Sequence, residues 1–198
     1  MMCVDLHVHT NASSDASISP KLLVDKLYAH SVVKGVAVTD HNTLDGYFQV
    51  RRLAAAYKDI LIIPGVEVAT SEGDLILLGI EEKPDYLSPL ETAVNFAKER
   101  GAVIVIPHPF RVSGIGNAAE TIPADAVEIM NQWATSQQNK LAEQLAKARN
   151  LPGVAGSDAH EPEALFTVYT EVDAEPDVAS VLDAIRKGRV KAVSARHI

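Results

Sequence analysis

Short apolar runs alternate with amphipathic segments along the chain. The runs predict nine strands, at residues 3–7, 35–39, 60–66, 75–80, 103–106, 126–130, 153–156, 167–172 and 190–193. Several of these runs, such as 60–63 and 103–106, are apolar at every position. Continuous apolar runs of this length are typical of strands that are covered on both faces, as in a parallel sheet.

The segments between the runs carry helix signals. Residues 19–20 (Ser-Pro) predict the start of a first helix, and residues 88–91 (Ser-Pro-Leu-Glu) form a capping-box pattern with proline at the first helical position. Thr135 or Ser136 is expected to cap a third helix, and Pro176 to begin a fourth. Strands and helices that alternate in this way indicate an α/β fold, either a barrel or a doubly wound sheet.

Composition and charge exclude several classes of protein. The 198 residues form one predicted domain without a linker or internal repeat, and the net charge of −8 provides no basic footprint for long duplex nucleic acid. Cys3 has no second cysteine to pair with, no secretory leader is recognisable, and no apolar run is long enough to span a bilayer. We therefore expect a cytoplasmic protein with no membrane partner, while the oligomeric state is not predicted.

Polar side chains gather where the predicted strands end. Five of the seven histidines lie there, and three carboxylates accompany them. The residues are His7, His9, His41, His108 and His160, with Asp40, Glu67 and Asp158. The carboxyl ends of the strands are where parallel α/β folds build their active sites. His30 and His197 have no such setting and are predicted to have no role in the site.

Two of these motifs have the spacing of metal ligands. Residues two apart on a strand point to the same side, so His7 and His9 can converge on one ion. Asp158 and His160 repeat the spacing with one oxygen and one nitrogen ligand. Either pair alone could be a polar strand end, but two such pairs in one chain favour a metal site.

Other residues strengthen or qualify this prediction. Glu67 lies among apolar neighbours, and a buried carboxylate costs several kcal/mol unless it is paired or bound to a cation. His108 lies between two prolines that restrict the backbone on both sides. Asp40 has the alternative role of a helix cap, and Asp15 that of an ordinary loop acid. Trp133 is predicted to be a packing residue rather than a substrate platform.

The ligand types indicate which chemistry to expect. Mixed nitrogen and oxygen ligands in this number suit two or three divalent ions such as zinc, manganese or iron. Ions a few ångströms apart create a bridging hydroxide and bind the oxygens of an in-line displacement at phosphorus. The chain has no Gly-x-Ser-x-Gly elbow and no glycine-rich phosphate loop. We therefore predict metal-assisted hydrolysis.

Five motifs, in order and over nearly the whole chain, resemble those of the PHP (polymerase and histidinol phosphatase) family. They occupy residues 5–10, 39–42, 65–67, 107–109 and 156–160. The resemblance implies a single domain over residues 1–198 that folds as a distorted seven-stranded, TIM-barrel-like (β/α)7 barrel. It also implies a phosphoesterase that acts on a small phosphorylated substrate or a short oligonucleotide.

The resemblance further implies three ion sites. The ligand sets carried over are His7, His9, Glu67 and Asp158 for the first ion, Glu67 and His108 for the second, and Asp15, His41 and His160 for the third. Members with three metals place another histidine on the sixth strand, where this chain has Glu128 and Asn131. Either residue replaces that ligand, or the second site is weak or empty, so two and three metals both stay open.

Two further residues are expected to assist the reaction. Arg111 is expected to bind the substrate phosphate, and Asp40 to orient a ligand or protonate the leaving group. One alternative is an amidohydrolase-type barrel that hydrolyses C–N or C–O bonds. Many enzymes of that type use a carboxylated lysine at the carboxyl end of a strand. Lys34 and Lys191 lie at strand beginnings instead. The other alternative is a non-catalytic, metal-binding regulatory module, which would be expected to have lost several ligands.

Overall fold

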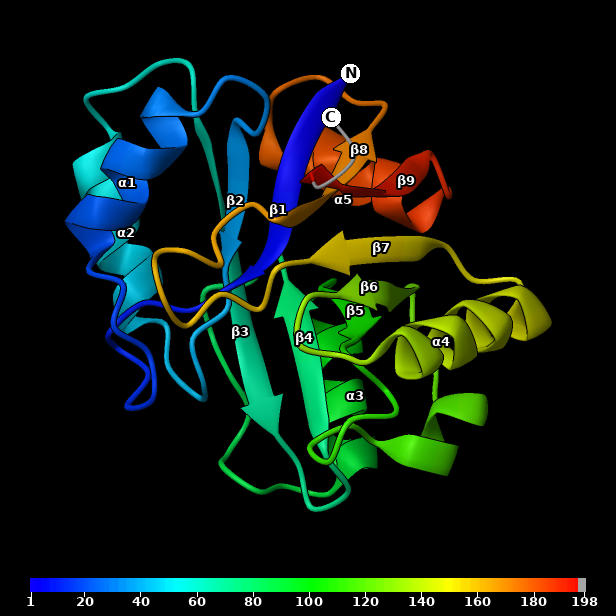
Figure 1. The fold of residues 1–198 in the computed structure, drawn as a ribbon. Coiled ribbons are helices and arrows are strands. Elements are labelled where there is room, and N and C mark those ends of the chain that lie inside the picture. The colour runs from blue at the N-terminus through cyan, green and yellow to red at the C-terminus, as the bar shows by residue number, and fades with distance from the viewer. Residues whose placement is uncertain (196–198) are drawn as a thin grey trace.

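The computed structural model describes residues 1–195, and it contains one sheet of nine strands in the order β7-β6-β5-β4-β3-β2-β1-β8-β9 (Figure 1). The strands are β1 (Met2–Val8), β2 (Gly35–Val38), β3 (Leu61–Ala69), β4 (Asp74–Leu78), β5 (Val103–Ile106), β6 (Ala126–Asn131), β7 (Gly153–Gly156), β8 (Val168–Val172) and β9 (Val190–Ser194). The helices are α1 (Pro20–Ala29), α2 (Asp45–Ala54), α3 (Leu90–Glu99), α4 (Ser136–Arg149) and α5 (Val178–Arg186), with a 3-10 helix at Gly116–Glu120.

The sheet curls until β7, at one end of the strand order, reaches β1 and β8, which confirms the distorted α/β barrel. Beyond the end of β7, the amide of Asp158 donates to the carbonyl of His7 (2.7 Å), and the amide of His9 donates to the carbonyl of Ala159 (3.0 Å). The hydroxyl of Thr170 on β8 accepts from the amide of Ala155 on β7 (2.8 Å). These bonds join β7 to β1 and β8 and nearly close the barrel.

The barrel has nine strands rather than the expected seven. β3 and β4 are joined by a short turn without a helix, so β4 runs antiparallel to both β3 and β5. β8 is antiparallel to β1, and β9 pairs in turn with β8. Strands without a helical crossover therefore account for the difference from a regular strand–helix repeat.

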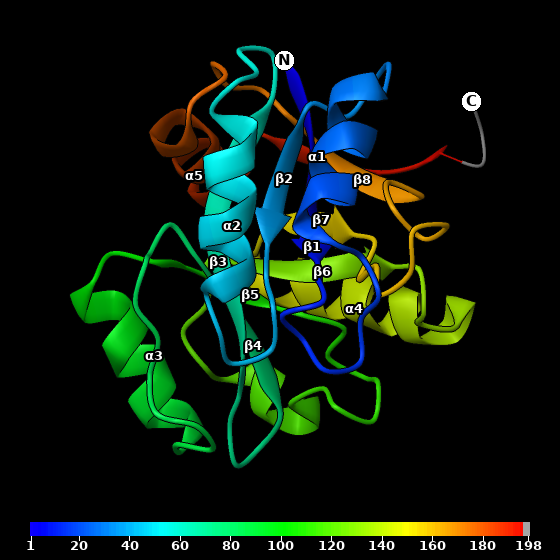
Figure 2. The same ribbon diagram turned by 90° about the vertical axis from the view of Figure 1, so that its left-hand side faces the viewer.

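Alternate side chains along the strands belong to two apolar clusters, one between the sheet and the helices outside it and one in the barrel interior. Ile104 and Ile106 of β5 face the outer cluster, whereas Val103 and Val105 face the barrel interior. Helices α1 and α2 lie side by side outside β2 and β3 (Figure 2), and α4 packs on β6. Helix α5 closes the end of the barrel at which β1 begins, where Leu182 joins the interior cluster. This packing leaves the opposite end for polar residues.

Two of the predicted helix starts are confirmed. Ser19 caps α1 by accepting a hydrogen bond from the amide of Leu22 (3.2 Å). Thr135 caps α4 in a reciprocal capping box with Gln138. Both cases follow the local rule that a short hydroxyl side chain satisfies a free amide in the first turn.

The other two starts differ from the prediction. Helix α3 begins at Leu90, whose amide donates to the side chain of Glu72 (2.8 Å), while the hydroxyl of Ser88 is buried without a hydrogen-bond partner. Helix α5 begins at Val178 and is capped by Asp177, not at Pro176. A carboxylate from another loop takes the place of the expected Ser88 cap, which local sequence could not reveal.

Candidate metal centre

A β-bulge in β1 turns both histidines of the first motif toward the barrel interior. Asp5 pairs with Val36 and Val8 pairs with Val38, so three steps along β1 match two along β2. Leu6 faces the interior before the bulge, and Val8 faces the outer cluster after it. Without the extra residue, strict alternation would have placed His7 and His9 on the outside.

A second bulge does the same for β6. Glu128 pairs with Val154 and Met130 with Ala155, so one residue is added between them. Glu128 points inward before the bulge, and Asn131, which is 1% exposed, lies beside it after the bulge. The two bulges together place polar side chains from neighbouring parts of the barrel at one end.

The first predicted ligand set is brought together as a compact group. The Nε2 atoms of His7 and His9 lie 3.0 Å apart, and each is 3.2 Å from Oε2 of Glu67. Oδ1 of Asp158 lies 3.3 Å from His7 Nε2 and 3.2 Å from His9 Nε2. All four side chains are nearly fully buried, so two carboxylates and two ring nitrogens converge on one small volume.

The third predicted set borders the first. His41 and His160 lie within metal-binding reach of His9, and Oδ2 of Asp15 is 3.5 Å from the Nε2 atoms of both His41 and His160. Nδ1 of His41 is also 3.2 Å from Oε2 of Glu67. Asp15 is the most exposed member of this set and faces solvent with about half of its side chain.

The second set contains a residue that the sequence analysis missed. Nε2 of His108 lies 3.1 Å from Oε1 of Glu67, the oxygen that does not face His7. Asp74, the first residue of β4, completes a group with Glu67 and His108. Burial and the charge of Glu67 raise the pKa of Asp74 to about 6. The signal was hidden because β4 reaches the site only through its antiparallel pairing with β3.

Glu128 and Asn131 lie beside the second set, and Glu128 forms a further group with His7 and His108 that could hold an ion, so its expected role as a replacement ligand stays open. Oε1 of Glu128 lies 3.0 Å from Nδ1 of His7, and its Oε2 accepts from the amide of His108 (2.9 Å) and from Nδ2 of Asn131 (3.0 Å). Nδ2 of Asn131 also donates to Oδ2 of Asp158 (3.2 Å). These contacts orient the histidines and Asp158 around the centre.

The ring nitrogens and carboxylates are arranged in a way that a cation would satisfy. Nδ1 of His7 faces a carboxylate and Nδ1 of His9 lies 3.4 Å from the hydroxyl of Ser13, so both Nε2 lone pairs point at each other and at Glu67. Such an arrangement of lone pairs and carboxylates requires a positive charge among them.

The pKa values of His9 and Glu67 also indicate that the carboxylates of the centre need positive charge beside them. Burial alone would lower the pKa of His9, but hydrogen bonds with Asp158 and Glu67 outweigh it and raise that pKa to about 9. Burial alone would raise the pKa of Glu67, yet the charge of His7 and hydrogen bonds from the surrounding histidines hold it well below its usual value. In the metal-free protein, protons on the histidines thus supply the charge that the carboxylates need.

Asp40 lies behind the ligands rather than among them. Its Oδ1 accepts from the amide of Thr10 (2.7 Å) and the hydroxyl of Ser13 (2.8 Å), and its Oδ2 accepts from the hydroxyl of Thr10 (2.8 Å). A Cβ at Gly46 would lie 1.9 Å from Oδ2, so the carboxylate is enclosed. Through Ser13, Asp40 positions His9. It caps no helix, because α2 begins after Leu44 without a side-chain cap.

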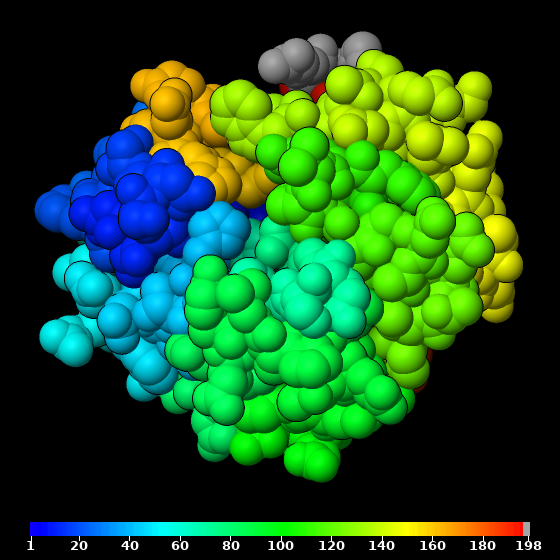
Figure 3. All heavy atoms as spheres, turned by 90° about the horizontal axis from the view of Figure 1, so that it is seen from below, coloured from blue at the N-terminus to red at the C-terminus, as the bar shows by residue number. Residues whose placement is uncertain are grey.

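Arg111 and Trp133 lie at the mouth of the centre. A hollow of about 260 Å³ is lined by Asp15, Arg111, Trp133, Asp158, His160 and Glu161. In Figure 3 the segments that carry these residues, blue, green and orange, surround a depression in the face seen from below. Nη1 of Arg111 donates to Oδ2 of Asp158 (2.5 Å). Trp133, which the sequence predicts to be a packing residue, is half exposed and forms part of the lining of this hollow.

Two of the candidate ligands have unusual backbone conformations. Asp158 has a φ of 54° and His108 has a φ of 23°, which place both in the left-handed region that non-glycine residues rarely adopt. Such conformations persist only where the surrounding structure holds them, and they concentrate at functional sites.

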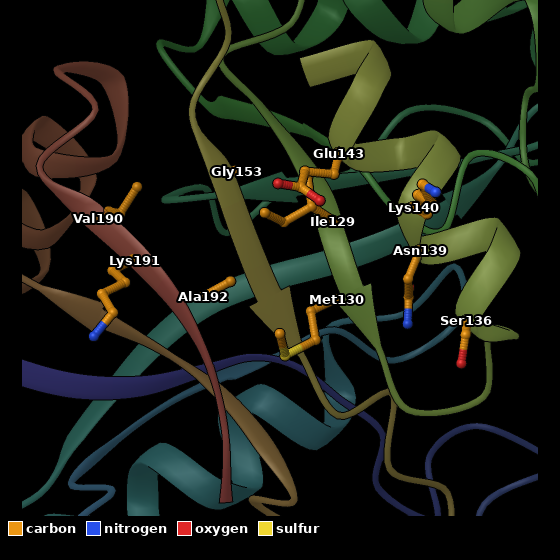
Figure 4. A pocket seen from close by; sticks show the side chains of 10 residues that line it. All are labelled: Ile129, Met130, Ser136, Asn139, Lys140, Glu143, Gly153, Val190, Lys191 and Ala192. Atoms are coloured by element: carbon orange, nitrogen blue, oxygen red, sulfur yellow. The ribbon is translucent and has the colours of Figure 1, made fainter. Parts of the chain in front are cut away.

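A larger hollow lies away from this centre. It has a volume of about 630 Å³ and opens between α4 and β9, over β6 and β7 (Figure 4). Its lining includes Asn139, Lys140 and Glu143 of α4 and none of the residues predicted for the metal centre. The candidate ligands Asp15, Asp158 and His160 therefore border the smaller hollow and not this one.

The two histidines predicted to have no role in the site have separate outcomes. His30 ends α1, and its Nδ1 accepts from the amides of Val32 (3.2 Å) and Val33 (2.8 Å), which is a structural role. His197 lies outside the described residues. Within residues 1–195, no helix is long and apolar enough to cross a membrane.

Relatives of the chain include two proteins of different kinds. The uncharacterized protein MJ1587 of Methanocaldococcus jannaschii is 30% identical over 145 residues, which cover 67% of this chain and 83% of that protein. A 5′-3′ exoribonuclease of Haemophilus influenzae is 33% identical over 118 residues, 58% of this chain and 42% of the enzyme.

Solved structures share the fold at low sequence identity. An amidohydrolase from Chromobacterium violaceum, solved with bound sulfate, has a TM-score of 0.71 at 18% identity, with 98% of this chain and 99% of that chain covered. A candidate metal-dependent phosphoesterase from Bifidobacterium adolescentis has a TM-score of 0.61 at 14% identity, with 79% and 87% covered.

Two family models match the chain itself. The PHP domain matches residues 5–102, which include the end of β1, all of β2 to β4 and the candidate ligands from His7 to Glu67. The PHP-associated model matches residues 136–190, which include Asp158 and His160. These matches agree with the barrel and with the cluster of histidines and carboxylates at its end, and the chain belongs to the PHP family.

Proposed function

We propose that this member of the PHP family is a phosphoesterase that hydrolyses a small phosphomonoester or the phosphoester of a short nucleotide. The coarser activity, metal-dependent hydrolysis, is supported by the family and by the buried ligand groups. The observation that carries the proposal is the position of Glu67. One of its oxygens faces His7, His9 and His41, and the other faces His108.

This position of Glu67 suits adjacent ion sites. A carboxylate whose two oxygens face different nitrogen ligands can bridge two ions a few ångströms apart. The first ion would be held by His7, His9, Glu67 and Asp158, the second by Glu67, His108 and Asp74, and the third by Asp15, His41 and His160. Zinc, manganese and iron all accept these nitrogen and oxygen ligands.

Ions of this kind, when bound, activate water for attack and neutralise charge on the phosphoryl oxygens. The protein's own residues orient the ligands for that chemistry. Glu128 fixes the ring of His7, and Asp40 acts on His9 through Ser13. Hydrogen bonds of this type determine which ring nitrogen faces the ion and how firmly the ring is held.

Arg111 is proposed to bind the substrate phosphate. Its guanidinium is about one-third exposed at the mouth of the hollow, and its Nη1 bonds to Asp158. A guanidinium offers five N–H donors in a planar fork, so the group can hold Asp158 and still present donors to a phosphate oxygen. The relation to a 5′-3′ exoribonuclease favours phosphoesters as substrates, including those of nucleotides.

Hydrolysis of a C–N or C–O bond is the second candidate, and the structural likeness to an amidohydrolase brings it forward. Within residues 1–195 no lysine is buried, whereas the first ligand group is, so the carboxylated lysine of many such enzymes has no counterpart among those buried side chains. This observation favours the phosphoesterase.

The test is release of inorganic phosphate from a panel of small phosphomonoesters and 5′-phosphorylated dinucleotides, assayed beside amides and lactones. The protein is loaded with manganese, and His9→Ala serves as the matched inactive variant. Phosphate release by the wild type and not by the variant supports the proposal. Hydrolysis of an amide or lactone without phosphate release overturns it.

A further inference from the structure

Trp133 is the one tryptophan in the chain, and its surroundings do not resemble those of a core residue. About half of its surface is exposed, although large aromatic side chains are usually well covered. It lines the same hollow as Arg111, Asp158 and His160. An indole face is therefore open to solvent beside the proposed ions.

The position of this indole is fixed by hydrogen bonds. Its Nε1 donates to the backbone carbonyl of Asp158 (2.9 Å), a residue of the first ligand set. The backbone amides of Trp133 and Ala134 donate to Oδ1 of Asn131 (2.9 and 3.2 Å), which holds the turn after β6. Nδ2 of Asn131 in turn bonds to Oδ2 of Asp158. Both the turn and the ring are tied to one metal ligand.

A ring held in this way has little entropy left to lose when a second flat group stacks on it. The rest of the hollow is polar and charged, with Arg111 on one part of the lining and Asp15 and Glu161 on another. Stacking on indole needs no hydrogen-bond pattern from its partner and accepts any flat π system, including each nucleobase.

We propose that Trp133 is a platform on which the flat, aromatic leaving group of the substrate stacks, so that the enzyme prefers nucleoside and aryl phosphomonoesters to aliphatic ones. The inference rests on the proposed phosphoesterase function. In the reaction, the oxygen of water bonds to phosphorus and the ester P–O bond breaks. The nucleoside or aryl alcohol leaves with a proton that the attacking water gives up.

Binding is measured first, with probes that cannot turn over. Phenylphosphonate and ethylphosphonate carry the same charged head on a flat or an aliphatic group, and their C–P bonds resist hydrolysis. We expect phenylphosphonate to bind the manganese-loaded protein roughly 5- to 100-fold more tightly, the range that stacking on an aromatic side chain provides. Because Trp133 is the only indole, its emission reports the stacking directly, and the flat probe should change it more than the aliphatic one.

Variants then separate stacking from general damage. Trp133→Ala should reduce the ratio of the two affinities to about one, and Trp133→Phe should retain most of it. Tyr28→Ala is the matched control, since Tyr28 is as exposed as Trp133 but packs beside Tyr57 on another part of the surface. Metal content and thermal unfolding of each variant confirm that the centre is intact.

The outcomes separate the two proposals. Equal affinity for both phosphonates in the wild type, or an unchanged ratio in Trp133→Ala, overturns the platform. Binding of neither phosphonate also overturns it. Phosphate release from aliphatic and aromatic esters at equal kcat/KM leaves the phosphoesterase standing and removes the platform. Preferential binding of phenylphosphonate without any phosphate release supports the platform and removes the phosphoesterase.

Discussion

Nδ1 of His7 lies 3.0 Å from Oε1 of Glu128, and this contact joins residues 121 positions apart in the chain. A carboxylate only accepts hydrogen bonds, so Nδ1 carries the hydrogen and Nε2 is left to face Glu67 and Asp158. Glu128 stands on the strand where three-metal members of the family have another histidine ligand. In this chain Glu128 orients the ring of His7, and it also belongs to a group with His7 and His108 that could hold an ion.

Glu128→Gln should weaken metal binding by about 10- to 100-fold, because the neutral amide holds the His7 ring less firmly and makes it a poorer ligand. Competition with a chromophoric chelator measures the affinity. Glu99→Gln on the exposed face of α3 is the control. An affinity equal to that of the wild type would show that Glu128 does not orient His7.

His9→Ala should abolish hydrolysis and leave the fold in place. The ring belongs to the first ligand group and lies within metal-binding reach of the third, whereas the barrel packing rests on the apolar clusters. Phosphate release and far-ultraviolet circular dichroism measure the two effects. Undiminished turnover by a variant that still contains its metals would remove His9 from the site.

Asp74→Asn should lower the number of bound ions by one per chain, because the amide is a weaker ligand beside Glu67 and His108. Burial and Glu67 raise the pKa of Asp74, so the neutral residue should not destabilise the metal-free protein. Metal analysis after gel filtration counts the ions, and thermal unfolding without metal checks the second point. An unchanged ion count would exclude Asp74 as a ligand.

Metal affinity should rise with pH. The pKa of His9 in the metal-free protein is raised to about 9 by Asp158 and Glu67 despite burial, so protons compete with metal until the pH passes that value. The stability of the metal-free protein depends on pH in the opposite direction. Stabilisation by protonated His9 is fully present below the unfolded pKa of about 6.5 and is lost as the pH rises through about 9.

Two titrations check this pH dependence. Manganese affinity measured from pH 6 to 9 should increase, with release of protons on binding, and the melting temperature of the metal-free protein should fall over the same interval. An affinity that is constant with pH would contradict the protonation of the histidines. In His9→Ala, both slopes should be smaller.

Asp40→Asn should destabilise the protein without altering the pH profile of hydrolysis. Asn offers one acceptor oxygen where Asp40 uses both, so a donor from Thr10 or Ser13 is left unpaired at a cost of about 1–3 kcal/mol. Chemical denaturation gives the stability, and kcat against pH gives the profile. Loss of one limb of that profile would instead make Asp40 a proton donor.

The sequence predicted those features of the site that depend on residue spacing within a single strand. The i, i+2 spacing of His7 and His9, and of Asp158 and His160, is a property of the strand itself. The carboxyl ends of parallel strands meet at one edge, which explains why distant motifs converge. The order and approximate limits of the nine strands also followed from local sequence, because each strand coincides with one apolar run.

The remaining features arise from pairing between distant segments. The bulge after Asp5, which turns His7 inward, exists only in relation to β2. Asp74 enters the centre because β4 pairs with β3, and Trp133 is fixed by a carbonyl 25 residues away. The missed cap of α3 has the same origin, because Glu72 comes from the turn between β3 and β4.

The most direct test of the account is a titration of metal-free protein with manganese, followed by phosphate release from an aryl phosphomonoester at each addition. We predict no release without metal, a rise that ends at two or three ions per chain, and complete loss when a chelator is added. Release that is independent of metal, or none from fully loaded protein, would contradict the assignment of this site as a metal-dependent phosphoesterase.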